Sequence, residues 1–436
     1  MIVIGVFVIL FLIIANISIV HALGGWLVVM IMHGPLVDHF KEDAVHVPLY
    51  IGIIILAVIF TRNKWRSVPP GIMAMVISLI MLMCMSAMLG LDPEASISSI
   101  LLYAKGFLMV IIIAMTIREE SEIRTITLYC LLGLFLGALL AFYQYKTGSF
   151  RVNTETIKRV ASLRGDPNDA AMLFLAGIPL AFYWFRSSTT SLRKSSFALC
   201  IALLLESIIL TGSRGGFLGM LFVLFLIYWK IRSLKTTVLA VVIVVAAVLV
   251  LPGGYTERMN TIFTGKELKK DQSTSIDMRK DLQKKGFEIM MNNLLVGVGP
   301  GNFGRAFFSQ VSDSNIKREM NWANKENVEL AAHNMYLEFF SENGVFGGIL
   351  LLFVLVKALL SLRKFDAGSN KREFALGYAI SVSLLGMYFA GMFLSQAKNS
   401  VLWFLVGIGL TSSVIVKKRM IDAAGDRTHL VQENTL

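Results

Sequence analysis

The chain has 436 residues, of which 56% are hydrophobic and only 16% are charged. Its mean hydropathy of +0.68 is far above that of a soluble domain, in which apolar residues make up about half of the composition. These values exclude a soluble globular enzyme. The formal net charge of +12 would suggest nucleic-acid binding in a soluble protein, but here the cations gather in short connections, as membrane orientation requires. We therefore expect a membrane protein with no nucleic-acid partner.

Apolar runs of about twenty residues, the length that one bilayer crossing needs, recur along the whole sequence. They predict an all-α polytopic membrane protein with about twelve transmembrane helices. The first run is longer than one crossing needs and could be one span or a span plus a re-entrant segment, divided at Gly24-Gly25. The predicted spans cover residues 3–31, 46–61, 69–89, 97–117, 125–145, 169–185, 196–211, 215–231, 236–251, 334–360, 374–394 and 400–416.

The distribution of Lys and Arg predicts the orientation of these spans. Cation-rich connections alternate with connections that carry few or no cations, and the cation-rich side is expected to be the cytoplasm, together with both termini. The predicted organisation is nine spans within residues 1–251, a long and partly helical extracytoplasmic loop at 252–333, three spans within 334–416, and a cytoplasmic tail at 417–436.

Two connections on the extracytoplasmic side differ from simple turns. Residues 146–168 carry more cations than anions on the side where the positive-inside rule predicts few, which indicates a functional role. Residues 252–333 contain an amphipathic segment from Met278 to Met291. Loops of this length are seldom without function.

Arg214 is the first candidate site residue, because it lies between two apolar spans in Thr211–Gly216 (TGSRGG). A guanidinium beside hydrocarbon is costly unless it meets an anion or water. The flanking glycines, Gly215 among them, expose backbone N–H groups, and the start of the next helix adds partial positive charge. The motif favours an anion such as phosphate; the alternative is an interfacial arginine that reaches lipid head groups.

Two more arginines lie in the unusual connections. Arg164 precedes Asp166-Pro167-Asn168, and these three residues are typical of a helix start. Arg164 is then left as a second contact to the same anion, because paired guanidinium donors suit phosphate oxygens. Arg279 lies on the amphipathic segment of the long loop.

A glycine-rich sequence, Val296–Phe303 (VGVGPGNF), follows that segment and contains Gly301 and Asn302. Such a run allows the backbone to turn tightly and to approach a ligand closely. It lacks the strand, helix and Lys-Ser/Thr pattern of a nucleotide loop, so ATP binding is not indicated.

The long loop ends at His333, where the chain re-enters the membrane. An unperturbed imidazole, with a pKa of about 6.5, can take a proton from an alcohol, and capping of the helix is the alternative role for His333. Asn334, Glu338 and Glu342 recur every four residues and share one helix face. Carboxylates at this depth need the protein interior.

Two charges lie deeper, within predicted spans. Lys105 is about midway along the fourth span, and Glu206 is roughly two turns before Arg214. Charges at such depth pair or face a cavity. Lys105 and Glu206 therefore either shape a polar chamber or form a structural ion pair.

Together the motifs resemble those of the O-antigen ligase and polymerase superfamily. The resemblance rests on Thr211–Gly216, on Val296–Phe303, on the pattern HNxYLx5NGx2G that starts at His333, and on the long outward loop before the last three spans. It extends over roughly residues 45–416. It implies an inverting, metal-independent glycosyltransferase of the bacterial cytoplasmic membrane, which moves a glycan from undecaprenyl diphosphate to an acceptor on the side of the periplasm or cell exterior.

The resemblance also implies roles for single residues. Arg214 and Arg279 match the arginines that contact the donor diphosphate, His333 matches the candidate base, and Arg164 is a less direct match. The expected partners are an undecaprenyl-diphosphate-linked glycan, a glycan or lipid acceptor such as lipid A-core, and membrane lipid. Further candidates for substrate binding are Lys105, Gly215, Gly301, Asn302, Asn334 and Glu338.

We expect neither a metal nor another cofactor. A sugar diphosphate already has a good leaving group, so positioned cations and a base suffice for transfer. The histidines and carboxylates in the connection 33–46 match no usual metal-ligand spacing.

Two alternatives stay open on the sequence. Ligases often have proline two places after the motif histidine, where this chain has Met335, and the start His333-Asn334 is equally familiar from exopolysaccharide polymerases. Ligation is slightly favoured over polymerisation. An alternative from another class is a secondary transporter of an anionic substrate, which would place its charges along a path near the midplane, whereas here they gather on one side.

Overall fold

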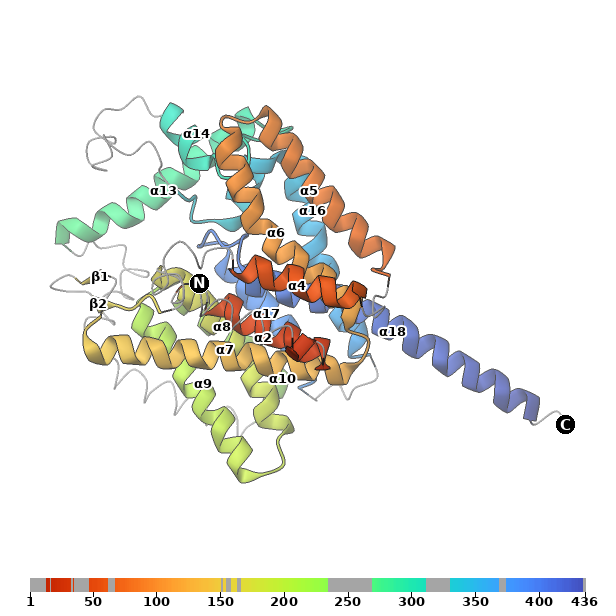
Figure 1. Ribbon diagram of the computed structural model, residues 1–436. Coiled ribbons are helices and arrows are strands. Elements are labelled where there is room, and N and C mark those ends of the chain that lie inside the picture. The colour runs from red at the N-terminus through yellow and green to blue at the C-terminus, as the bar shows by residue number, and fades with distance from the viewer. Residues whose placement is uncertain are drawn as a thin grey trace.

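The computed structural model describes residues 13–15, 17–32, 34, 47–61, 67–149, 152–153, 158–162, 166–233, 269–310, 330–367 and 374–433. Figure 1 shows a bundle of helices from which α18 projects toward the C-terminus. The elements are α2 (Ile19–Ile31), α4 (Val47–Thr61), α5 (Pro70–Leu89), α6 (Pro93–Thr116), α7 (Glu120–Thr147), β1 (Val152–Asn153), β2 (Lys158–Arg159), α8 (Pro167–Ser187), α9 (Ser191–Thr211), α10 (Arg214–Ile231), α13 (Lys269–Asn292), α14 (Phe303–Gln310), α16 (Met335–Phe365), α17 (Leu376–Ala390) and α18 (Ser400–Glu433).

The predicted all-α class is confirmed for the described residues. β1 and β2 have two residues each and pair antiparallel in one small hairpin. Eight described helices are long and apolar enough to cross a membrane, namely α5 to α10, α16 and the first part of α18. The chain is therefore a membrane protein with multiple spans.

The count of about twelve spans is not reached within the described part of the chain. Shorter apolar helices lie at three predicted spans, within α2, α4 and α17. The predicted span 236–251 and the first part of 3–31 lie outside the described residues. At the C-terminus, α18 continues as one helix through the predicted boundary at residue 417.

α8 and α18 form the centre of the bundle. In their apolar windows 72% and 78% of the residues are buried, against 28% in α9, whose surface is left for lipid. α8 packs against α9 and α17, and α18 packs against α16 and α6. The first residues of α8 and of α18 are therefore held by neighbours on several sides.

The connections between helices meet at two ends of the bundle. One end contains the α5–α6 turn, the β1–β2 hairpin, the starts of α8 and α16, and the α9–α10 and α17–α18 connections. Hydrogen bonds join these segments, for example Arg159 Nε to Thr211 O (2.8 Å) and Met335 N to Gly391 O (2.7 Å). We call this the His333 end. At the other, the basic end, Arg419 of α18 pairs with Glu120 at the start of α7 (2.9 Å).

A kink divides α16, and the glycine-rich run Val296–Phe303 packs against it. Gly344 has φ +70° and ψ −178°, so the helix ladder breaks there. A Cβ at Gly344 would lie 2.3 Å from Leu295 O, which leaves room for glycine alone. The backbone oxygens of Ser341 and Glu342 instead accept hydrogen bonds from the N–H groups of residues 298 and 299, both at 3.0 Å, as buried carbonyls require.

Candidate active site

The TGSRGG motif forms the tight turn between α9 and α10. Gly212 ends α9 with φ +58°, the left-handed conformation that suits glycine. Ser213 caps α10, and its Oγ accepts a hydrogen bond from Gly216 N (3.2 Å). Arg214 is the first residue of α10 and is half-buried. The turn thus fixes an arginine at the start of a membrane-spanning helix, where the helix dipole also favours an anion.

Arg159, from the β1–β2 hairpin, lies against this turn. Its Nε donates to Thr211 O (2.8 Å), and its Nη2 donates to Asn168 Oδ1 (3.1 Å). Ser213 Oγ donates to the same oxygen of Asn168 (2.8 Å). Arg159 was not among the predicted site residues; the only sequence signal for it was the excess of cations in 146–168.

Asp166 and Pro167 begin α8 as predicted. The Asp166 carboxylate accepts a hydrogen bond from Asn168 N (2.6 Å), and Pro167 occupies the first turn. Asn168 is thereby oriented toward Arg159 and Ser213. Arg164, two residues before this cap, lies outside the described residues.

Arg159, Arg214 and Arg279 gather at the His333 end. Burial is the main cause that lowers the pKa of Arg159, to about 10; the charges of Arg279 and Arg214 lower it further, and Asp166 opposes them. The pKa of Arg279 is lowered too, first by burial and then by Arg214. A positive neighbour lowers the pKa of a cation only at short range. The guanidinium groups from α10, α13 and the hairpin therefore lie near one another.

His333 borders this arginine cluster. Burial lowers the pKa of the imidazole to about 4; Arg279 lowers it as well, and Asp166 opposes the shift. His333 is therefore neutral near pH 7. Its backbone has φ +51°, a left-handed conformation that is uncommon outside glycine and often marks functional positions.

Asn334, and not His333, caps α16. Its Oδ1 accepts hydrogen bonds from Tyr336 N and Leu337 N, both at 3.1 Å. The alternative role of His333 as the helix cap is therefore wrong. Because its oxygen is used in the cap, Asn334 has a structural task, and its contact with substrate stays a prediction.

Glu338 holds the backbone beside His333. Its Oε2 accepts a hydrogen bond from Ala332 N (2.8 Å) and another from the hydroxyl of Ser395 in the α17–α18 connection. Glu342 lies one turn deeper on the same helix face and is buried, as predicted for a carboxylate at that depth. Glu338 therefore fixes the turn that presents the imidazole.

Gly301 and Asn302 lie elsewhere at the His333 end. Asn302 is fully buried, and its Nδ2 donates to Asp92 O and Ser96 Oγ, both at 3.0 Å, at the start of α6. A Cβ on Gly301 would lie 2.9 Å from Ser99 Cβ, also on α6. The run approaches the protein's own helices closely, so the structure gives these residues a structural task and does not bring them to the arginine cluster.

The remaining candidates are placed as follows. Gly215 packs against Phe393 and Leu394 of the α17–α18 connection. Lys105 is buried in α6, whereas Glu206 is exposed on α9, so the two do not share a chamber. Within the described residues no three histidine, cysteine or acidic side chains are grouped as metal ligands. Most of the connection 33–46 lies outside those residues.

Comparison with known proteins supports the superfamily that the motifs resemble. Residues 198–352 match the sequence model of the family described as O-antigen ligase. The resemblance to this superfamily of membrane enzymes is thereby confirmed. No curated protein matches the chain.

The matched segment of the O-antigen ligase family runs from α9, through the long loop, to α16 just beyond its kink. It contains Arg214, Arg279 and His333, the three residues that the resemblance assigned to catalysis. Arg159 and Lys105 precede it. In the folded chain Arg159, from the α7–α8 connection outside the matched segment, therefore lies beside the arginines of that segment.

Proposed function

We propose that this O-antigen ligase family protein transfers a glycan from undecaprenyl diphosphate to an acceptor hydroxyl on the outer face of the bacterial cytoplasmic membrane. The observation that carries the proposal is the meeting of Arg159, Arg214 and Arg279 beside a neutral His333. A diphosphate is the anion in such a donor, and guanidinium groups bind phosphate oxygens through paired hydrogen bonds.

The proposed reaction is a single displacement at the anomeric carbon. The acceptor oxygen attacks from the face opposite the diphosphate, its proton passes to the His333 imidazole, and the bond between the anomeric carbon and the phosphate oxygen breaks. Undecaprenyl diphosphate leaves with the bonding electrons, and the arginine cluster stabilises its negative charge. The anomeric configuration is inverted, and no metal is needed.

The positions of the charges support a transferase over a transporter. The arginine cluster and His333 lie together at one end of the bundle, whereas a transporter would place its charges along a path through the midplane. Ligation of the glycan to lipid A-core or a similar acceptor is favoured, and polymerisation of glycan repeats is the second candidate. Deletion of the gene tests both: loss of glycan-capped lipid indicates a ligase, and single-repeat products indicate a polymerase.

The proposed orientation places the His333 end outside the cytoplasm. In a variant without its three native cysteines, a cysteine at Ser149 should react with an impermeant thiol reagent in spheroplasts. A cysteine at Ser191, at the other end of the bundle, should react only after the membrane is opened. Both positions are exposed, so a thiol there can meet the reagent. The reverse labelling pattern would overturn the orientation.

Glu338 is expected to act as a positioning residue. Glu338→Ala leaves the Ala332 N–H without its acceptor, at a cost of about 1–3 kcal/mol. Because this bond holds the turn that presents His333, the same cost in the transition state lowers kcat by about 5- to 150-fold. Glu338→Gln offers a carbonyl oxygen at the same place and should restore most of the loss. Ser395→Ala, which removes only the second hydrogen bond, should cost less. A glutamine variant as slow as the alanine variant would indicate that the charge itself acts on substrate.

A further inference from the structure

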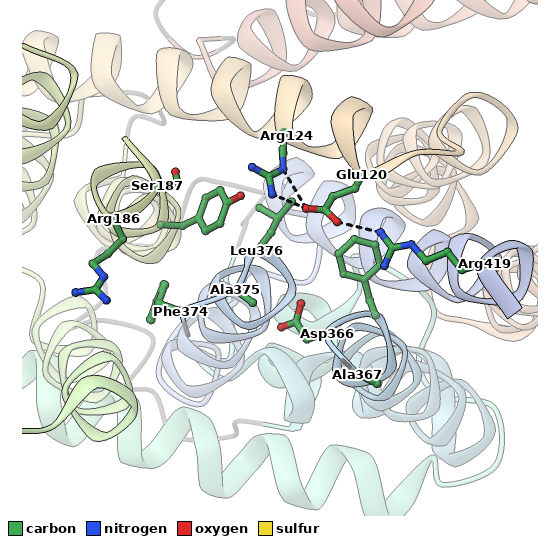
Figure 2. Close-up of a pocket in the computed structure, with 12 residues that line it drawn as sticks. Glu120, Arg124, Arg186, Ser187, Asp366, Ala367, Phe374, Ala375, Leu376 and Arg419 are labelled. Atoms are coloured by element: carbon green, nitrogen blue, oxygen red, sulfur yellow. Dashed lines mark hydrogen bonds and ion pairs between the residues drawn. The ribbon is translucent and has the colours of Figure 1, made fainter. Parts of the chain in front are cut away.

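A cavity of about 540 Å³ opens at the basic end of the bundle, away from the arginine cluster. It lies among the start of α7, the end of α8, the α16–α17 connection and α18 (Figure 2). Three arginines line it, Arg124 from α7, Arg186 from α8 and Arg419 from α18. Neither the family match nor the proposed reaction assigns a task to this cavity.

Two of these arginines are held in fixed positions. Arg124 and Arg419 both pair with Glu120, at 2.6 and 2.9 Å, through different carboxylate oxygens. Their guanidinium groups also lie over aromatic rings, Arg124 at 5.6 Å from the ring centre of Tyr183 and Arg419 at 4.8 Å from that of Phe365. One carboxylate thus pairs with two guanidinium groups, so these three side chains together carry a net charge of +1.

Arg186 adds a third positive charge. Its side chain is exposed, and Figure 2 shows it extending away from the Glu120 carboxylate. No carboxylate pairs with it among the described residues. It therefore adds a positive charge at the rim of the cavity, with no acidic partner among the residues that the structure describes.

The remaining acid of the cavity is engaged with a helix end. Asp366 accepts a hydrogen bond from Gly377 N (3.1 Å) and another from the backbone of Tyr378, at the start of α17. Burial raises the pKa of Asp366 to about 6, so a fraction of it is protonated near neutral pH. Among the described residues that line the cavity, three arginines against Glu120 and Asp366 give a net charge of at least +1.

We propose that this cavity binds the phosphate of an anionic phospholipid headgroup. It opens where membrane-crossing helices end, the level at which lipid headgroups lie, and basic pockets between such helices bind anionic lipids. Guanidinium groups bind phosphate oxygens, and Tyr183 and Phe365 give the cavity apolar walls. Further cations follow on the same helix ends, Arg363 and Lys364 on α16 and Lys417 and Lys418 on α18.

A phosphate in the cavity would join α7, α8 and α18 through their arginines. Lipid binding should therefore stabilise the folded protein, an effect that can be measured without turnover and does not depend on the proposed reaction. We expect phosphatidylglycerol, added to the purified chain in neutral detergent, to raise the melting temperature by on the order of 5 °C. Phosphatidylcholine, which carries no net charge, should have much less effect.

Variants of Arg186 test the site, because this exposed side chain can be changed without breaking any ion pair of the described residues. Arg186→Gln should lose at least half of the shift in melting temperature, and Arg186→Glu should lose nearly all of it. Arg193→Gln, at an exposed position at the start of α9 outside the cavity, is the matched control and should respond like the wild type. Native mass spectrometry should show the same order of bound phosphatidylglycerol.

Three results would overturn the proposal. The first is an equal shift with phosphatidylglycerol and phosphatidylcholine. The second is an Arg186→Glu variant that responds like the wild type. The third is equal stabilisation by millimolar glycerol 3-phosphate, which would assign the cavity to a soluble phosphate compound instead of a lipid.

Discussion

Lysine in place of Arg279 is expected to lower kcat/KM for glycan transfer by about 10- to 100-fold. The substitution keeps the positive charge but removes the planar fork that gives a phosphate two parallel hydrogen bonds. The loss of one charge-assisted hydrogen bond costs about 1.5–3 kcal/mol, and each 1.36 kcal/mol is about tenfold in rate. The assay is transfer from a purified lipid-linked donor. Arg214→Lys should behave in the same way.

The matched control for this prediction is Arg305→Lys. Arg305 lies on α14, at the same end of the bundle, and pairs with Asp92 at 2.9 Å with about a third of its side chain exposed. Exposed pairs of this kind contribute about 0–1 kcal/mol, so the control should keep nearly full activity. Wild-type turnover in both the Arg279 and Arg214 variants would remove these arginines from the donor site.

Arg159→Lys should differ from both, because Arg159 also holds the protein together. Its hydrogen bonds to Thr211 O and Asn168 Oδ1 join the hairpin to the α9–α10 turn and α8. We therefore expect a lower melting temperature along with lower activity. The Arg279 variant, with no such bonds in the described structure, should lose activity alone.

The contrast among the arginines shows what sequence reasoning could reach. Arg214 was predictable because a guanidinium between two apolar spans is costly without an anion or water, and Arg279 followed from the family resemblance. Arg159 was not, since its contact at Thr211 is 52 residues away in sequence. Only the folded hairpin brings it there, and an excess of cations indicates a region but no particular residue.

The glycine-rich run illustrates a different limit. Its composition correctly predicts close approach of the backbone, but a composition does not say what is approached. The partner is the kinked α16, whose carbonyl groups at Ser341 and Glu342 need donors once the helix breaks at Gly344. The helix start at Asp166-Pro167, by contrast, follows from local chemistry, and the structure confirms it.

His333→Asn is expected to lower kcat by about 10²- to 10⁴-fold, the usual contribution of a general base. Asparagine is the informative replacement, because it tolerates the left-handed backbone that position 333 adopts but cannot take a proton near neutral pH. The variant should therefore fold and still bind the donor lipid. Retention of activity within a few fold of the wild type would exclude a base role for His333.

The pH profile separates a base from a cationic hydrogen-bond donor, and the structure changes the expected window. An unperturbed imidazole would titrate near 6.5, but burial and Arg279 lower the pKa of His333 to about 4. A base must be neutral, so kcat/KM, which reports the free enzyme, should rise as pH increases through about 4 and stay flat from about 5.5 to 8.5.

The bound diphosphate adds negative charge beside the imidazole and raises its pKa, so the acid limb of kcat should lie at higher pH than that of kcat/KM. An imidazolium donor requires the opposite, a rate that falls as pH increases.

Arg279→Gln tests whether His333 is the group that titrates. Without the neighbouring cation the pKa of His333 rises, so the acid limb of kcat/KM should move to higher pH. A histidine with a purely structural role would not produce this shift.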